Sequence, residues 1–399
     1  MKKSLFIVIL FFSVSHLLNA QPACIKDVIY SLVSLKEVPK ARKMMEEQCF
    51  PGNESSADVW LVRANVFIQL YDYENERKIK DPKYVHKWPD AIIISNESFY
   101  KALELKPDIK ASVGLLDPKD GQLLSAYPIS ELASKAMEKK DYTEAIRLLN
   151  IVIRSYKADP KGYAQFLAYA YLDLSNCYKA IGDDANNLKL LQDASKLNVP
   201  EPEIYLNLYD IYRQSNDTVK CGEIINQARR VIPDSLAINL RSYELDYYNM
   251  VGDTLKLKTA AVKMYEQYTD NLAVINIVAG HLVNNKEYLT AQEIIEAGLA
   301  IDSNSFELNQ QMTYRYYYEA ADYDDLKNEQ LKLKKYLAAK DLLDKSNEIL
   351  EVAAVWAEKA YNIYKEDKEH NIMFRQILVR LMLPVSDELQ TKVDSYYQH

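Results

Sequence analysis

Glycine and histidine are scarce in this chain, and neither stands in a pattern that carries chemistry. Nine glycines are spread over 399 residues, and the closest pair, Gly114 and Gly121, matches no phosphate-binding loop. The five histidines lie outside any H-E-x-x-H or paired-cysteine setting, and no serine stands in G-x-S-x-G. The sequence therefore predicts no catalytic site, no cofactor and no metal site. A hydrolytic site assembled from residues far apart in the chain is the alternative.

An excess of basic residues is also missing. The formal net charge is −8 at pH 7, and no run of lysine and arginine interrupts the acidic balance. Proteins that bind nucleic acid need a basic face, because most of their affinity comes from contacts with phosphates. We therefore expect no nucleic-acid partner.

Long hydrophobic runs are absent except at the start of the chain. Two lysines precede an apolar run from Leu5 to Phe12, and Ala20 supplies a small residue after it. This layout predicts a secretory signal peptide at residues 1–20, cleaved between Ala20 and Gln21. A membrane anchor is the alternative, but the run is shorter than a span requires. We expect an exported protein, periplasmic or associated with the outer surface, with no membrane span after cleavage.

Only four cysteines are present, and two of them are placed for a disulfide. Cys24 opens the first predicted helix and Cys49 closes the second, with Pro39 between the two helices. Antiparallel helices of similar length bring these ends together, and a bond closing a loop of this size stabilises the hairpin by about 3 kcal/mol. Two unpaired thiols are the alternative. The sequence leaves open whether Cys177 and Cys221 pair.

The residues that are abundant recur with a fixed spacing. Hydrophobic residues make up 48% of the chain, and 31 tyrosines favour helices with aromatic packing. The residue after the "DYTE" of "KKDYTEAIRLL" has counterparts at intervals of 34 to 36, apart from a first interval of 42. These positions are Ala145, Asn187, Cys221, Leu257, Ala291 and Leu326. A period near 34 is typical of a helix–turn–helix repeat that buries its apolar face against its neighbours.

One repeat, at residues 203–235, carries the whole pattern. In its first helix (helix A), Leu208 and Tyr209 form the core pair and Tyr212 is the aromatic. Asn216 and Asp217 form the turn. In the second helix (helix B), Ala228 is the small residue, and Pro233 ends the repeat. This pattern resembles the tetratricopeptide repeat. The resemblance implies an all-α fold, a right-handed superhelical solenoid with a concave groove, here of about seven to eight helical hairpins.

The repeat spacing and the interruptions between repeats predict five parts of the chain. These are the signal peptide (1–20), divergent N-terminal hairpins with a polar insertion at residues 72–90 (21–106), a linker rich in proline and glycine (107–128), a regular array (129–340), and a C-terminal hairpin with a capping helix (341–399). The capping helix is expected because the ends of such arrays need a polar outer face.

The resemblance also implies which helix A residues face the groove. They are Asn176, Lys179, Asp210, Arg213, Asp246, Asn249, Asn284, Arg315 and Tyr318. Such a polar strip can bind an extended peptide backbone and pair with selected charges, although an ordinary solvated face is the alternative at each position. The first inward positions, Tyr169, Glu203, Asn239 and Ala273, lack the cations that clamp a C-terminal carboxylate in some family members.

The tyrosine-rich stretch "TYRYYYEAADYDD" allows two interpretations. Tyr314 and Tyr317 occupy core positions of a helix A, which leaves Tyr316 and Tyr318 for the surface or groove. Packing is the favoured interpretation, and an aromatic platform for a sugar or peptide is the alternative.

The function predicted from these features is a non-catalytic interaction scaffold of the bacterial cell envelope that binds a protein or peptide segment. A carbohydrate-binding accessory protein is the alternative, with a glycan as partner. Gln21 after the cleavage site resembles exported proteins of Bacteroidetes-type bacteria. Triplets beginning at Asp217, Asp234 and Asp253 resemble the O-glycosylation sequence of that group, but they are also ordinary turn and helix-cap chemistry.

Overall fold

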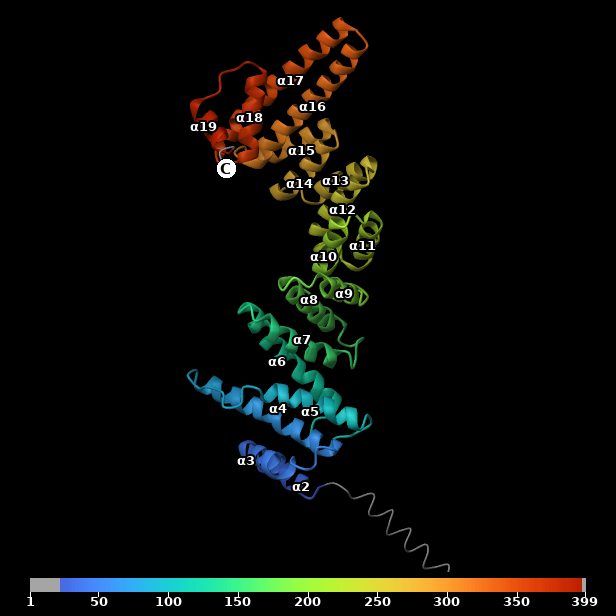
Figure 1. The fold of residues 1–399 in the computed structure, drawn as a ribbon, viewed down its shortest axis with the longest axis vertical. Coiled ribbons are helices and arrows are strands. Elements are labelled where there is room, and N and C mark those ends of the chain that lie inside the picture. Colours follow the sequence, from blue (N-terminus) through green and yellow to red (C-terminus); the bar gives the residue numbers. More distant parts are fainter. Residues whose placement is uncertain (1–21, 397–399) are drawn as a thin grey trace, which may run out of the picture. The chain divides into compact units, whose positions relative to one another are not determined.

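The computed structural model describes residues 22–396, so the predicted signal peptide, its cleavage site and the last three residues lie outside the described residues. Within residues 22–396 every regular element is a helix (Figure 1). The chain divides into two compact units, Met1–Val199 and Pro200–His399. Each unit is built from consecutive helix pairs, as the sequence predicts.

The first helix pair is closed by a disulfide. Helix α2 (Cys24–Ile29) continues into a π-helical turn (Tyr30–Ser34), and α3 (Val38–Met44) continues into another (Met45–Cys49). The Cα atoms of Cys24 and Cys49 are 5.5 Å apart, and their sulfurs are bonded. The predicted disulfide is therefore present, and the alternative of two unpaired thiols is wrong.

The second pair is uneven in length. Helix α4 (Ala57–Lys80) has 24 residues and α5 (Ala91–Leu105) has 15, so the end of α4 extends past its partner (Figure 1). The loop 81–90 folds back over this end. The Tyr84 hydroxyl donates a 2.7 Å hydrogen bond to the carboxylate of Glu74, which also accepts from the backbone N–H of Lys87. The insertion expected at residues 72–90 is thus a helical extension followed by a fastened loop.

The predicted linker is shorter than expected. Helix α6 (Pro118–Glu138) begins inside it, so only the first part of the range 107–128 is irregular. Pro118 fits the first turn of a helix, where its missing N–H would have no partner, and Asp117 caps the turn. Pro128 lies inside the helix and removes one bond, to the carbonyl of exposed Leu124. The second part of the predicted linker is therefore helical, and packing against α5 stabilises the helix despite Pro128.

Close packing of α6 on α5 depends on a small residue. A Cβ atom on Gly121 would stand 2.2 Å from the ring of Phe99, so only glycine fits there. The same contact is held by a buried amide. Asn96 of α5 donates hydrogen bonds of 2.8 Å to the Ser125 hydroxyl of α6 and 2.9 Å to the Ser155 hydroxyl of the following helix.

Three further helices complete unit 1. They are α7 (Tyr142–Tyr156), α8 (Ala164–Ala180) and α9 (Asp184–Ser195). Cys177 on α8 is a buried free thiol, and so is Cys221 in unit 2, so the two cysteines left open by the sequence do not pair. Burial raises the pKa of the Cys177 thiol to about 11.

Unit 2 continues the pairing with longer helices toward the C-terminus. Its elements are α10 (Pro202–Gln214), α11 (Thr218–Val231), a 3-10 turn (Asp234–Leu236), α12 (Ile238–Met250), α13 (Thr254–Gln267), α14 (Leu272–Asn284), α15 (Tyr288–Ile301), α16 (Phe306–Lys332), α17 (Tyr336–Ile363), α18 (Lys368–Arg380) and α19 (Asp387–Ser395). The expected boundary between residues 340 and 341 falls inside α17. Helices α16 and α17 instead form one long hairpin.

The turn between helices A and B has one geometry throughout the array. One residue takes the left-handed conformation, with φ of 79° at Gly182 and 55° at Asn216. The next residue caps helix B, and its N–H donates to the carbonyl five residues back, 2.9 Å in the case of Asp217. The pairs of residues are Lys140–Asp141, Gly182–Asp183, Asn216–Asp217, Gly252–Asp253, Lys286–Glu287 and Lys334–Lys335. This recurrence is the structural form of the sequence repeat.

Two of the aspartates in the Asp-Ser/Thr triplets serve this turn. Asp217 and Asp253 accept hydrogen bonds from the backbone N–H groups of Lys220 and Lys256, so they act as helix caps. Whether the threonines that follow them are glycosylated stays a prediction.

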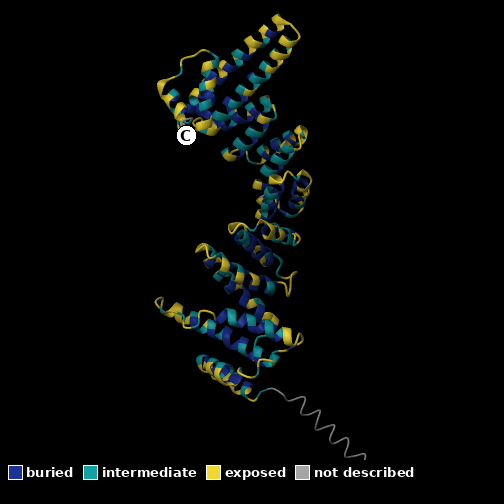
Figure 2. Cartoon of the chain, viewed as in Figure 1, coloured by how far each residue is buried: buried dark blue, intermediate teal, exposed yellow. Residues whose placement is uncertain are grey.

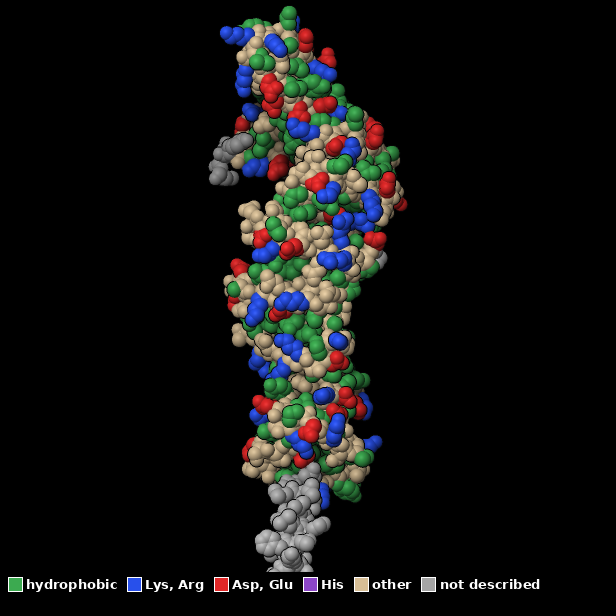
Figure 3. All heavy atoms as spheres, turned by 90° about the vertical axis from the view of Figure 1, so that its right-hand side faces the viewer, with side chains coloured by type: hydrophobic (Ala, Val, Ile, Leu, Met, Phe, Trp, Pro, Cys, Tyr) green, Lys and Arg blue, Asp and Glu red, His purple; other side chains and the backbone are tan. Residues whose placement is uncertain are grey.

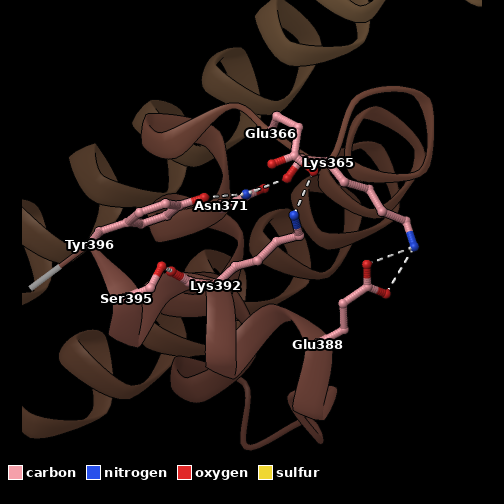
Figure 4. A network of polar contacts seen from close by, with 7 residues as sticks. All are labelled: Lys365, Glu366, Asn371, Glu388, Lys392, Ser395 and Tyr396. Carbon is pink, nitrogen blue, oxygen red and sulfur yellow. Dashed lines mark hydrogen bonds and ion pairs between the residues drawn. The ribbon is translucent and has the colours of Figure 1, made fainter. Parts of the chain in front are cut away.

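Helix α19 packs against α18 in unit 2. Its Lys392 forms a 2.6 Å ion pair with Glu366, and its Glu388 forms a 2.9 Å pair with Lys365 (Figure 4). The Tyr396 hydroxyl accepts a 3.0 Å hydrogen bond from the Asn371 amide. Leu389 and Val393 meanwhile fill the core beneath α19.

The described helices form nine consecutive pairs, α2–α3 through α18–α19. The count exceeds the seven to eight hairpins expected because α18 and α19 form a pair of their own. The fold is an all-α solenoid of tetratricopeptide-type helix pairs.

Candidate functional site

The predicted polar strip on α10 and α12 is a network of contacts between neighbouring repeats. Arg213 forms a 3.0 Å ion pair with Asp246, which also accepts a 2.8 Å hydrogen bond from the Tyr209 hydroxyl. Asp210 accepts a 3.1 Å hydrogen bond from the Tyr243 hydroxyl. Burial, followed by the bond to Asp246, raises the pKa of Tyr209. The structure thus pairs Arg213 with Asp246, and it gives each of the two aspartates, Asp210 and Asp246, a tyrosine hydroxyl as a hydrogen-bond donor.

The remaining strip residues have fewer contacts. Asn249 is exposed, and its side-chain oxygen accepts a 3.0 Å hydrogen bond from the Asn285 amide. Asn284 ends α14 and is exposed. Asn176 and Lys179 lie on α8 in unit 1, where the asparagine is half-buried and the lysine exposed.

Arg315 is not on the open face of α16. Only 4% of it is exposed, and its guanidinium lies 4.0 Å from the centre of the Tyr316 ring and pairs with Glu319. The open face instead carries Gln310, Tyr314 and Tyr318, which follow the three- and four-residue steps of one helix stripe. The repeat pattern predicted that Arg315 faces the groove, but a helix of 27 residues offers several stripes, and Arg315 lies on a buried one.

The tyrosine cluster is partly a packing feature. Tyr314 is half-buried and packs against two core clusters, and its ring is parallel to that of Tyr318 at 5.9 Å. Tyr318 is 37% exposed, as its expected surface position requires. Burial, and then the carboxylates of Asp367 and Glu369, raise the pKa of Tyr314 to about 12. The hydroxyl of Tyr314 therefore lies in an acidic environment.

A cleft of about 990 Å³ opens beside this stripe, in unit 2. It lies where α14 and α16 begin, where α17 ends and where α18 is capped. Its lining residues are Leu272, Ala273, Asn276, Asp302, Asn304, Ser305, Phe306, Glu307, Gln310, Ile363, Tyr364 and Asp367. Three of them are carboxylates, and none is a lysine or arginine.

Amides and aromatic rings complete the cleft. The side-chain oxygen of Asn276 is buried and has no hydrogen-bond partner among the residues that the structure describes. The Gln310 amide donates a 3.4 Å hydrogen bond to Asp367, which caps α18 by accepting from the N–H of His370. The rings of Phe306 and Tyr364 meet edge to face at 5.3 Å. The cleft thus offers hydrogen-bonding groups, negative charge and apolar contacts, mostly from residues at the first turns of α14 and α16.

Sequence reasoning missed most of this cleft. Ala273 was recognised as the first inward position of α14, and one helical turn further along the same face leads to Asn276. Glu307 and Gln310 hold the equivalent places on α16. The register of the repeats could have predicted the cleft residues on α14 and α16. It could not have predicted those of α17 or Asp367, because these come from segments distant in sequence.

Comparisons with known proteins find similarity to solved structures alone, at low sequence identity. No family model matches the sequence, and no curated protein matches it. Among solved structures, Pseudomonas aeruginosa PilF is 14% identical, with 63% of this chain and 92% of that chain covered and a TM-score of 0.29. A tetratricopeptide-repeat protein from Bacteroides fragilis is 12% identical, with 79% and 98% covered and a TM-score of 0.22. Yeast Tom70 is 11% identical, with 93% and 91% covered and a TM-score of 0.31.

Two other kinds of site are absent from the described residues. In residues 22–396 no three His, Cys, Asp or Glu side chains gather in a way that could hold a metal ion. None of the helices in the same part of the chain has the length and apolar character needed to cross a bilayer.

Proposed function

We propose that the chain is a non-catalytic interaction scaffold of the bacterial cell envelope, and that it holds an extended, positively charged segment of a partner protein in the cleft beside α14 and α16. The observation that supports this most is the charge of the cleft. Asp302, Glu307 and Asp367 line it, and no lysine or arginine balances them among the lining residues.

A peptide segment suits the other groups of the cleft. An extended backbone carries both donors and acceptors, and the amides of Asn276 and Gln310 can pair with either kind. The unpaired oxygen of Asn276 is an acceptor that a peptide N–H would satisfy. Ala273 leaves room for the chain, and the rings of Phe306 and Tyr364 provide rigid apolar contact.

This proposal moves the binding site away from the strip on α10 and α12. Asp210, Arg213 and Asp246 are engaged in holding neighbouring repeats together. Alanine at these positions would loosen the array as well as change its surface, so binding data on such variants would not isolate a groove.

Export is supported by the disulfide. Bonds of this kind persist in oxidising compartments such as the periplasm and the cell surface, and are rare in the cytosol. The Cys24–Cys49 bond and the predicted signal peptide are therefore consistent with the same location. Cell fractionation of a chain carrying a C-terminal tag tests this directly, and a tag found in the cytoplasm at full precursor size would contradict it.

The binding test compares two single carboxylates. Glu307→Gln removes a charge from the cleft, and Glu293→Gln removes one from an exposed position on α15 as a matched control. The probe is an array of extended synthetic peptides that differ only in lysine, arginine, glutamate or alanine at set positions. We expect the wild type and the control to prefer cationic peptides, and Glu307→Gln to bind them about 3- to 10-fold more weakly.

Raising the salt concentration should weaken the same binding, because it screens exposed charge pairs. Equal binding of cationic and acidic peptides by the wild type would contradict the proposal. Equal weakening by Glu307→Gln and Glu293→Gln would place the peptide elsewhere.

A glycan is the second candidate ligand, because Tyr318 and Tyr364 present partly exposed rings on this side of unit 2. Sugars stack on such rings, and the neighbouring carboxylates and amides can accept hydrogen bonds from the sugar hydroxyl groups. A glycan array separates this case, since binding that is lost on Tyr364→Ala but unchanged by Glu307→Gln would favour a carbohydrate.

A further inference from the structure

The α16–α17 hairpin ends in an apolar tip that the rest of residues 22–396 leaves exposed. Both helices run on together beyond the neighbouring pairs, and the tip is exposed (Figures 1 and 2). The exposed fractions are 43% for Leu331, 61% for Leu333, 68% for Tyr336 and 81% for Leu337. Of the residues from 331 to 340, Ala339 is the one that is buried. Single exposed leucines are ordinary, but four large apolar side chains gathered around one turn are not.

The same tip is basic although the chain as a whole is acidic. The segment from Gln330 to Lys340, "QLKLKKYLAAK", contains four lysines and no aspartate or glutamate. In the described part of the chain, no hydrogen bond or ion pair joins the side chains of these lysines to another residue. Figure 3 shows basic, hydrophobic and acidic side chains at this end of unit 2. The lysines are therefore available to an external negative charge.

The geometry points to an anionic phospholipid surface as the occupant of this tip, and we propose that the α16–α17 hairpin docks the protein on one. Leucines and a tyrosine can enter the boundary between headgroups and acyl chains while lysines pair with the phosphates. Tyrosine favours this boundary because its ring is amphipathic.

The shape of the tip favours a fluid surface over a protein partner. Its apolar side chains surround a turn rather than line a face, with Leu331 and Leu333 on the α16 side and Tyr336 and Leu337 on the α17 side. A convex point of this kind enters a bilayer without a matching pit, whereas a protein partner would need one. The docking is separate from the peptide cleft, whose lining includes no residue of the tip.

The test is flotation of the chain from Pro22 onward with vesicles of phosphatidylcholine, with and without phosphatidylglycerol. Two tip variants are compared with the wild type: Leu333→Ser with Leu337→Ser, and Lys332→Gln with Lys334→Gln and Lys335→Gln. The replaced side chains are exposed, so the fold should be kept, and circular dichroism checks this.

The α4 end of unit 1 supplies matched controls. Ile79→Ser with Val85→Ser removes two side chains that are 81% and 80% exposed, and Lys80→Gln with Lys83→Gln and Lys87→Gln removes three exposed lysines. We expect the wild type and both controls to bind the anionic vesicles alike. Each tip variant should bind at least about 10-fold more weakly. Pure phosphatidylcholine vesicles should hold much less protein.

Three results would overturn the proposal. Retained vesicle binding by both tip variants would show that another surface is responsible. Equal loss in the tip and control variants would show non-specific adhesion. Sedimentation that reveals self-association, abolished by the tip variants in a chain that does not bind vesicles, would assign the tip to a second copy of the chain. Glu307→Gln must bind vesicles as the wild type does, so failure of the peptide proposal is recognised separately.

Discussion

In unit 1, helix α4 runs past α5, the helix it pairs with, and in unit 2 the α16–α17 hairpin runs past the neighbouring pairs. The ends of these two extensions differ. The end of α4 is covered by its own connecting loop. Lys78 donates hydrogen bonds of 2.7 and 2.8 Å to the carbonyls of Pro82 and Tyr84, and the fully buried Glu74 holds Tyr84 and Lys87. The α16–α17 tip turns within three residues and has no loop to cover its leucines.

The difference shows that an extended helix can serve two purposes. In unit 1 the charged side chains satisfy the chain's own carbonyls and hydroxyls, so the extension is a finished part of the fold. In unit 2 the fastening lies part-way along the hairpin, about two to three helical turns from the tip. There, Arg380 donates a 2.6 Å hydrogen bond to Ser346 and pairs with Asp324. The tip is left with unpaired lysines and bare apolar side chains, which is why we assign it an external partner.

Among substitutions that test this comparison, Glu74→Ala should cause the largest loss of stability. The buried carboxylate accepts two hydrogen bonds that hold the loop 81–90, and hydrogen bonds to charged groups contribute about 1.5–3 kcal/mol. We expect a loss of about 2 kcal/mol in the free energy of unfolding, measured by urea denaturation, and faster hydrogen exchange in residues 81–90.

Glu76→Ala is the matched control on the same helix. Glu76 is exposed, and its ion pair with Lys80 is 3.9 Å long, so we expect a change within about 0.5 kcal/mol. If Glu74→Ala leaves the exchange of the loop unchanged, the loop is not fastened as described, and the contrast between the two ends is lost.

A smaller loss of stability is expected from Arg380→Ala on α18, which contacts the α16–α17 hairpin at Ser346 and Asp324. The guanidinium is about one-third exposed, with 31% of its side chain accessible, so solvent screens part of its pair with Asp324. We expect a loss of about 1 kcal/mol, read from the urea midpoint. A double-mutant cycle with Asp324→Asn isolates the pair, and additive single effects would show that the two side chains are not coupled.

The smallest effect should be a pH dependence located in unit 2. His370 is fully buried beside the base of the hairpin, its Nε2 is 2.9 Å from the Ala357 carbonyl oxygen, and burial lowers its pKa. The unfolded chain therefore binds a proton more readily than the folded chain. The contribution of neutral His370 to the free energy of unfolding is therefore fully present above the ordinary histidine pKa of about 6.5. It is lost as the pH falls from that value toward the lower pKa of the folded state.

His370→Gln tests this assignment. We expect its unfolding free energy to fall less between pH about 7.5 and about 5.5 than that of the wild type, because one proton-binding group is gone. Urea denaturation at each pH gives the two slopes. Identical slopes would show that His370 does not contribute to acid destabilisation.

The sequence predicted the elements that depend on local chemistry. The spacing of turn residues such as Asn216 and Asp217 identified the repeat, because each left-handed residue and each cap is needed wherever helices A and B meet. Cys24 and Cys49 could be paired because two helices of known length fix the positions of their ends. These inferences need only neighbours within one hairpin.

The errors arose where distant packing decided the result. Pro118 and Pro128 fall in the predicted linker, but the face of Gly121 and Ser125 is buried against α5 and its neighbours and holds that stretch helical. Arg315 was placed in the groove, but the rings of Tyr288 and Tyr316 provide a better environment for its guanidinium. Local pattern does not reveal which of two helix stripes a neighbour will cover.

The sequence alone determined that the chain is all-α and that it repeats with a period near 34 residues, and it favoured the cross-link in the N-terminal hairpin that the structure contains. These properties follow from composition, turn chemistry and short-range geometry. Only the tertiary structure decided that Asp246 joins two repeats, that Glu307 and Asp367 face one cleft, and that the leucines of the α16–α17 tip stay uncovered. Each of these depends on how helices far apart in sequence pack together. The energy of such contacts cannot be inferred from either segment alone.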